Sequence, residues 1–440
     1  MAEGRIHVYV GPTCPAGEIL QRFPQVVIHP PVSHGDFFSS DIGSGDVAVV
    51  VDGFYHHRLG ARHKEYLYAL DRGVTVIGAA SIGALRALEL NAFGMQGVGS
   101  VYDLYRAGVF DGDDAVAVAH ESGAPYLSLS VPLVNLHAAA QAASIAGVLR
   151  ESDVDNVISV LRSEYYPSRT KARVLHILHR AGWPELAEWY ERQVADDPYV
   201  FDRKRSDCLS AVDAAHHLVA AGAVGQVTGA KDDTWKTLFL RMWGNYFLGM
   251  TGDPPLGRRL AYQQIFNPGY PRVWERYLEE TYRRYRQGSA EGSARSLEDS
   301  LSRRIGLSGF PLSGAREKRE MKDWLYDFIC PVPDLSDPFE VELLLSAEEP
   351  PDVEAVALHL REMQEFTSRN TGPLDQDIST VLSDDASKIL LCNIWKIPPK
   401  ELSREYRSRG IPNIKTAVRI LQPFIVGAIK EQKYLRAESA

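Results

Sequence analysis

Hydrophobic and polar positions alternate in blocks along the first third of the chain. Four short apolar runs predict β-strands, at residues 6–10, 26–29, 47–51 and 74–78. Segments with helical spacing of apolar positions follow three of them, at residues 16–23, 59–71 and 82–90. Uniformly apolar runs are typical of strands that are buried on both faces, and this order predicts βαβ units with right-handed crossovers.

The remaining two thirds have a different pattern, because long helical stretches dominate and all seven tryptophans lie after residue 150. The predicted fold class is therefore α/β, with a small, mostly parallel sheet domain followed by a largely helical C-terminal region. Two low-complexity stretches, 288–302 and 346–352, indicate linkers or loops. We expect three parts, an α/β core, a helical region and a C-terminal helical segment with a basic end, at residues 1–150, 151–345 and 346–440.

Composition narrows the class of protein. A net charge of −9 argues against an electrostatic nucleic-acid binder, although residues 400–440 hold nine Lys or Arg against four Glu. No apolar run approaches the ~20 residues that span a bilayer, and no signal-peptide pattern opens the chain, so we expect no membrane partner and a cytoplasmic location. The four cysteines are far apart and form no C-x-x-C pair, which favours free thiols over a zinc site or disulfides.

Ser81 is the first candidate for chemistry. It lies in VTVIGAASIGALRALEL, where a buried strand meets a helix through small residues. This resembles the G-x-S-x-G nucleophile elbow, with Ala79 in place of the first glycine and Gly83 as the second. The N–H groups of Ile82 and Gly83 would then face a developing oxyanion. A serine at such a junction can equally serve as a helix N-cap, and both interpretations stay open.

Lys64 is the candidate base, because it is the only lysine among the first 150 residues, where eight arginines carry the other positive charges. Burial can lower the pKa of a lysine enough for it to accept a proton, whereas arginine stays protonated. The neighbouring His63 is a rival base, and at most one of the two faces the site. A solvated lysine on an amphipathic helix is the alternative.

Four further groups complete the candidates. Asp52 follows a buried strand and can orient a base or bind a ligand, or else form an Asp-Gly turn. His120 is a secondary acid or base candidate. Cys14, beside a helix start, is the alternative nucleophile or sulfur carrier. A metal cluster would have to use three histidines whose spacing matches no standard site, namely His56, His57 and His63.

An ordered series of short motifs across residues 5–145 resembles the core of the TfuA family, which covers about a third of the chain. The motifs that carry the resemblance are GPTCP, Pro30-Pro31, Gly35-Asp36, VDGFY, HKE, GAASIGALRALEL, FGMQGVG, DDAVAVAH and PLVNL. TfuA proteins are partners of ATP-dependent YcaO enzymes that install backbone thioamides in ribosomally made peptides. The resemblance implies a Ser–Lys hydrolase, with Ser81 and Lys64 in those roles, that releases sulfide from a thiocarboxylated ThiS-like carrier.

The resemblance therefore implies three partners, a YcaO-type enzyme, a ThiS-like sulfur carrier and a precursor peptide, and it implies no cofactor. It gives no role to Cys14. A non-catalytic adaptor that docks these partners together is the alternative function, with the helical region supplying the surfaces. Phosphate binding at Ser81–Gly83 is a weaker third possibility, because the chain has no P-loop and no G-x-G-x-x-G motif.

Overall fold

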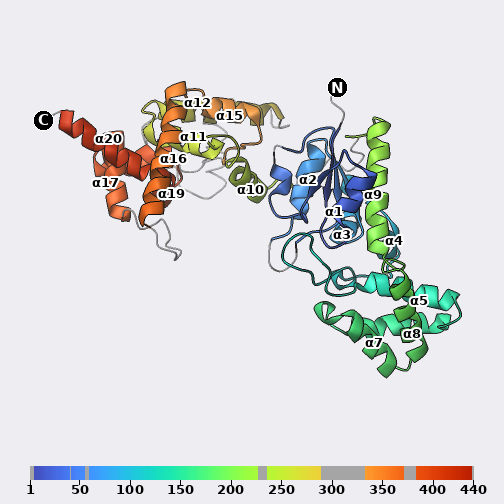
Figure 1. Ribbon diagram of the computed structural model, residues 1–440. Helices are drawn as coiled ribbons and strands as arrows, with labels where there is room; N and C mark the ends of the chain where they lie inside the picture. The colour runs from blue at the N-terminus through green and yellow to red at the C-terminus, as the bar shows by residue number, and fades with distance from the viewer. Residues whose placement is uncertain are drawn as a thin grey trace, which may run out of the picture. The chain divides into compact units, whose positions relative to one another are not determined.

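The computed structural model describes residues 4–39, 41–54, 59–225, 235–288, 332–370 and 383–438. The chain divides into two compact units, Met1–Thr237 and Leu238–Ala440, each described here by itself (Figure 1). This division differs from the expected boundaries near residues 150 and 345. The N-terminal unit is longer than the expected 1–150 core because a later helix, α9 (Arg203–Ala220), returns to pack on the sheet.

The N-terminal unit is built on a five-stranded, fully parallel sheet with the strand order β2-β1-β3-β4-β5. The strands are β1 (Ile6–Tyr9), β2 (Val27–His29), β3 (Val47–Val50), β4 (Thr75–Ala79) and β5 (Gln96–Val98). The α/β class and the four predicted strands are confirmed to within one residue at each end. In doubly wound sheets of this order, ligands bind beyond the carboxyl ends of the strands.

Helices cover both faces of this sheet. One face packs against α1 (Ala16–Arg22) and α9, and its core includes Val8, Val49 and Ala211. The other face packs against α2 (His63–Asp71) and α3 (Ile82–Leu90), and its core includes Val50 and Val76. Figure 1 shows the sheet between these helices. Both faces of β3 are therefore buried, as its uniformly apolar sequence requires.

The rest of the N-terminal unit consists of helices and the loops that join them. Its helices are α4 (Ser100–Arg106), α5 (Leu133–Ile145), α6 (Val154–Arg162), α7 (Lys171–Arg180) and α8 (Pro184–Asp196). The chain then returns through α9, whose buried Asp207 carboxylate accepts hydrogen bonds from the Ser100 and Val101 N–H groups at 2.9 and 2.7 Å. These bonds cap the start of α4 and hold α9 against the α/β core.

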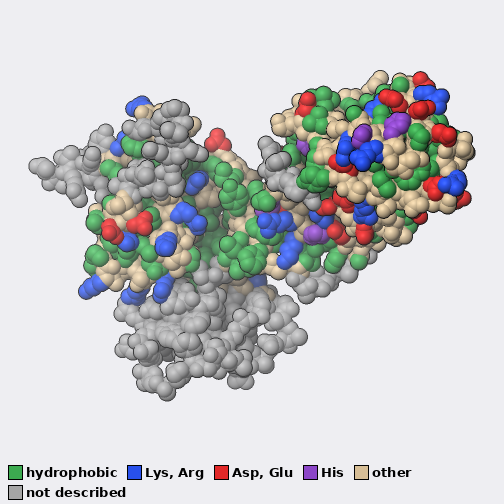
Figure 2. All heavy atoms as spheres, turned by 90° about the horizontal axis from the view of Figure 1, so that it is seen from below, with side chains coloured by type: hydrophobic (Ala, Val, Ile, Leu, Met, Phe, Trp, Pro, Cys, Tyr) green, Lys and Arg blue, Asp and Glu red, His purple; other side chains and the backbone are tan. Residues whose placement is uncertain are grey.

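The C-terminal unit is helical throughout its described part. Its helices are α10 (Leu238–Leu248), α11 (Leu256–Phe266), α12 (Tyr270–Gly288), α15 (Pro338–Leu344), α16 (Pro350–Asn370), α17 (Asp384–Trp395), α18 (Leu402–Ser408), α19 (Ile414–Leu421) and α20 (Ile425–Glu438). Its interior is held by Arg409, which is buried and donates to the carbonyls of Gln264 and Asn267 at 3.1 and 2.8 Å. Hydrophobic side chains gather on the surface of α10 (Figure 2), including Phe239 and Tyr246. No helix of the described chain is both long enough and apolar enough to cross a membrane.

Candidate functional site

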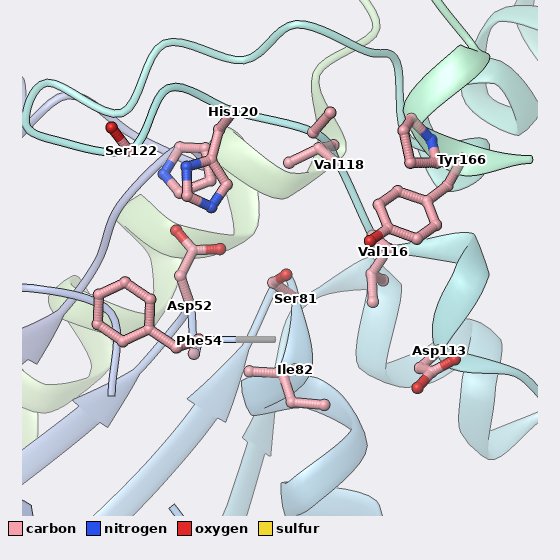
Figure 3. A pocket seen from close by; sticks show the side chains of 15 residues that line it. Asp52, Phe54, Ser81, Ile82, Asp113, Val116, Val118, His120, Ser122 and Tyr166 are labelled. Carbon is pink, nitrogen blue, oxygen red and sulfur yellow. The ribbon is translucent and has the colours of Figure 1, made fainter. Parts of the chain in front are cut away.

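A pocket of about 490 Å³ opens at the carboxyl ends of β3 and β4. Five segments wall it: the loop after β1, the chain after β3, the turn between β4 and α3, a loop that runs over the top, and the short 3-10 helix η5 (Tyr166–Ser168) (Figure 3). Its lining residues are Pro12, Asp52, Gly53, Phe54, Ser81, Ile82, Asp113, Val116, Ala117, Val118, Ala119, His120, Ser122, Tyr166 and Pro167. The pocket thus contains four of the six predicted site residues: Asp52, Ser81, Ile82 and His120.

Ser81 stands on a strained turn. The Ser81 N–H donates to the Ala79 carbonyl at 2.6 Å, which closes a three-residue γ-turn with Ala80 at its centre. Ala80 has a φ of 64°, a left-handed conformation that costs a residue with a Cβ on the order of 1–3 kcal/mol. Ser81 does not use its hydroxyl to cap α3. In Figure 3 this hydroxyl points into the pocket, and it has no hydrogen-bond partner among the described residues.

Two glycines fix how closely α3 approaches the sheet. A Cβ on Gly83 would lie 1.9 Å from the Val50 carbonyl oxygen, and one on Gly78 would lie 2.0 Å from the Gly83 carbonyl oxygen. The Gly83 N–H donates to the Val51 carbonyl at 3.2 Å, so the structure contradicts its expected place in an oxyanion hole. The Ile82 N–H, at the first position of α3, has no acceptor among the described residues and remains the candidate oxyanion donor.

Asp52 organises the loop after β1. Its Oδ2 accepts the Gly11 and Thr13 N–H groups at 2.8 and 3.0 Å, and its Oδ1 accepts the Thr13 hydroxyl at 2.6 Å. Both carboxylate oxygens are therefore occupied, and the side chain is buried. Asp52 closes the crevice between β1 and β3 and holds Pro12 in the pocket wall.

One ring nitrogen of His120 is hydrogen-bonded, and the other has no partner among the described residues. Its Nδ1 lies 2.7 Å from the Glu121 carbonyl oxygen, which can only accept, so Nδ1 carries the proton in the neutral ring. Nε2 is then the basic nitrogen, and it has no partner in the described part of the chain. Figure 3 shows the His120 ring at the rim of the pocket, above Asp52 and Ser81. His120 can therefore accept a proton inside the pocket.

Lys64 lies elsewhere. Its Nζ donates to the Thr237 hydroxyl at 2.8 Å, and Lys64 does not line the pocket. Its neighbour Glu65 points inward instead, where its carboxylate accepts the Gly35 N–H at 2.7 Å and contacts the His34 Nδ1 at 2.7 Å. The expected pairing of Lys64 with Ser81 is thus not among the contacts that the structure contains.

The other candidates also lie outside the pocket. Cys14 is buried, with its Sγ 4.0 Å from a Glu18 carboxylate oxygen. His63 pairs with Glu89 at 2.8 Å on the surface. His56 and His57 fall outside the described residues, and the described residues contain no group of three or more His, Cys, Asp or Glu that could hold a metal ion.

Lys204 is a buried amine that the sequence analysis missed. Its Nζ donates to the carbonyl of Val116, a residue of the pocket wall, at 2.8 Å. Burial lowers the pKa of Lys204, and the carboxylates of Asp52 and Asp202 partly offset this effect. In the sequence, Lys204 lies in the charged run DRKRSD. Such a run is typical of a solvated helix face, so it gives no indication that this lysine is buried.

Most of this site lies in a part of the chain that resembles a known protein family. Residues 52–170 match the family model of TfuA-like proteins. This part of the chain is TfuA-like. No curated protein matches the chain. The TfuA-like region contains Asp52, Ser81 and His120, and it ends before Lys204.

Proposed function

We propose that the N-terminal unit is a thioamidation accessory hydrolase, with Ser81 as its nucleophile. It releases sulfide from a thiocarboxylated, ThiS-like carrier protein for a YcaO-type enzyme that installs backbone thioamides in a ribosomally made peptide. The observation that carries this proposal is the Ser81 hydroxyl. It lies on a strained turn, makes no capping hydrogen bond to α3, and points into the pocket. The TfuA-like region supports the sulfur chemistry and the partners.

The reaction proceeds in two steps. The Ser81 Oγ attacks the carbonyl carbon of the thiocarboxyl group, the C–S bond breaks, and sulfide departs with the proton that Ser81 gave up. Water then attacks the acyl-serine ester, which returns the carrier carboxylate and the free hydroxyl. The Ile82 N–H stabilises the oxyanion in both steps, and its position at a helix start adds to this effect.

His120 is the group that we propose takes the proton from Ser81. Its Nε2 is open to the pocket, because Nδ1–H is bound to the Glu121 carbonyl. Lys204 acts behind the pocket wall, where its amine holds the Val116 carbonyl. A lysine thus remains next to the site, but it comes from α9 rather than from α2.

The test is sulfide release from a thiocarboxylated carrier, together with mass spectrometry of the quenched reaction. We expect wild type to release sulfide and to form a carrier–protein ester at Ser81. Ser81→Ala should do neither and should lower the rate by about a thousandfold or more, as loss of a nucleophile does. Ser159→Ala, which changes an exposed serine on α6, is the matched control and should behave as wild type.

A non-catalytic adaptor is the second candidate, and one observation favours it: Lys64 binds Thr237 rather than Ser81. An adaptor predicts that carrier and YcaO enzyme bind the chain while no sulfide appears above the carrier's own hydrolysis. Sulfide release by wild type that is no faster than the carrier's own hydrolysis, with both partners still bound, would therefore replace the hydrolase with the adaptor.

A further inference from the structure

The loop over the pocket is a pair of extended arms. The Leu129 N–H donates to the Ala119 carbonyl at 2.7 Å, and the Glu121 N–H donates to the Leu127 carbonyl at 3.0 Å. Between these two bonds His120 and Ser128 form an antiparallel bridge. His120 and Ser128 are therefore a non-hydrogen-bonded pair, whose own main-chain groups point away from the opposite arm.

The arm that lines the pocket thus has an open edge. Neither the N–H nor the carbonyl of His120 has a partner among the described residues, and the same is true of Val118 within that part of the chain. Figure 3 shows the arm with Val118, His120 and Ser122 running along the rim above Asp52 and Ser81. Unpaired main-chain groups of this kind are a template for another extended chain.

We propose that this edge binds the C-terminal end of a polypeptide in extended conformation, by main-chain pairing with residues 118–120. Alternate residues of the bound tail exchange hydrogen bonds with the edge, as in β-strand addition. The tail then leads its terminal carbonyl carbon toward the Ser81 Oγ. This inference rests on the proposed function only for the identity of the terminal group; the pairing itself requires no hydrolysis.

The pocket's chemistry favours a peptide tail over a charged small molecule. Its lining includes two acids, Asp52 and Asp113, and no lysine or arginine, so it opposes a phosphate group of about two negative charges more strongly than the single charge of a thiocarboxylate. A neutral amide backbone matches the open N–H and carbonyl groups instead. On the opposite arm, Leu127 and Leu129 are each 56% exposed, which places apolar surface beside the tail for the body of a carrier protein.

The test uses the full chain and a probe that cannot be turned over, a fluorescein-labelled pentapeptide of alanine and glycine with a C-terminal amide. Binding is measured by fluorescence anisotropy, and each amide of the probe is replaced in turn by an ester, which removes one N–H. We expect about 2–10-fold weaker binding for esters at alternate positions, and no change at the positions between them. Equal affinity for every ester, or no binding of the parent peptide, would overturn the proposal.

A pair of protein variants tests the edge from the other side. Val118→Pro removes one open N–H and should weaken binding of the probe about fivefold, whereas Val118→Ala keeps that N–H and should bind the probe within twofold of wild type.

Ser81→Ala separates this inference from the proposed function. If Ser81→Ala binds the probe with the alternating ester pattern and still releases sulfide, Ser81 is not the nucleophile of the proposed hydrolase, and the tail site stands. If wild type releases sulfide but shows no ester pattern, the hydrolase stands and the tail site fails.

Discussion

The loops after β3 and β4 occupy equivalent places at the same edge of the sheet, yet they treat their polar side chains in opposite ways. Asp52, after β3, accepts three hydrogen bonds at 2.6–3.0 Å, so both of its oxygens are already hydrogen-bonded. Ser81, after β4, faces the pocket with no partner for its hydroxyl among the described residues. A group with hydrogen bonds to the protein holds structure, and an open one is available to a ligand. Position at the strand end is therefore not enough to assign a chemical role.

Replacing Asp52 gives the largest expected effect on stability. Asp52→Ala leaves two N–H groups and one hydroxyl buried without their acceptor, which should cost about 3–4 kcal/mol in the N-terminal unit. Thr13→Val, which removes only the hydroxyl donor, should cost about 1 kcal/mol. Hydrogen exchange of the β1 and β3 amides in the full chain measures both. If Asp52→Ala lowered sulfide release without speeding exchange, Asp52 would belong with the open groups.

His120, like Ser81, has a side-chain atom without a partner among the described residues, its Nε2. His120→Gln removes the basic Nε2, and we expect sulfide release to fall about 10²–10⁴-fold, the usual contribution of a general base. Hydrogen exchange in the sheet should not change, because the hydrogen bond to the Glu121 carbonyl and the edge contact with the Tyr126 ring both lie within the loop. His176→Gln, on the exposed side of α7, is the control and should behave as wild type. An unchanged rate in His120→Gln would move the base elsewhere, with Lys204 next to be tested.

His137 is a buried histidine whose Nδ1 accepts a hydrogen bond from Arg203 at 3.0 Å, and its titration should appear in stability. Burial, with a smaller contribution from Arg203, lowers the pKa of His137 to about 4. Below its unfolded pKa of ~6.5, only the unfolded chain takes up the proton. Stability should therefore fall by up to about 1.4 kcal/mol per pH unit as the pH drops from 6.5 towards 4.

His137→Asn, which keeps an acceptor for Arg203 but does not titrate, should flatten this dependence. Urea unfolding of wild type and variant at several pH values measures it, because other acid-sensitive groups cancel in the difference. Two parallel curves would mean that His137 titrates alike in the folded and unfolded chain, and would contradict the effect of burial on its pKa.

Lys64 gives the smallest expected effect, and it decides between the sequence interpretation and the structure. The Lys64–Thr237 hydrogen bond predicts that Lys64→Met costs about 0.5–1.5 kcal/mol, with sulfide release within twofold of wild type. A Ser81–Lys64 pair predicts instead that Lys64→Met and Lys64→Arg both lose activity by orders of magnitude. The same sulfide assay, with both variants side by side, distinguishes them.

Local pattern predicted most of the sheet, because β1, β3 and β4 are apolar runs that need burial on both faces. It missed β5, since Gln96-Gly97-Val98 has neither length nor an apolar run. Within the site, the strand-to-helix turn around Ser81 could be predicted from its small residues. The direction of Lys64 could not, because its neighbour Glu65 occupies the inward position on α2. The burial of Lys204 could not be predicted either, since it depends on α9 returning to the sheet.

The close contact of Gly78 and Gly83 with neighbouring carbonyls limits how this site can change during evolution or engineering. Any side chain at either position would collide with backbone, so the height of the Ser81 hydroxyl above the sheet is not adjustable by substitution there. Variation has to come from other parts of the pocket wall, at Val116 and Val118 in the loop above and at Tyr166 in η5, where no glycine is required. A search for variants with altered acyl-group preference should therefore randomise these loop positions and keep the two glycines unchanged.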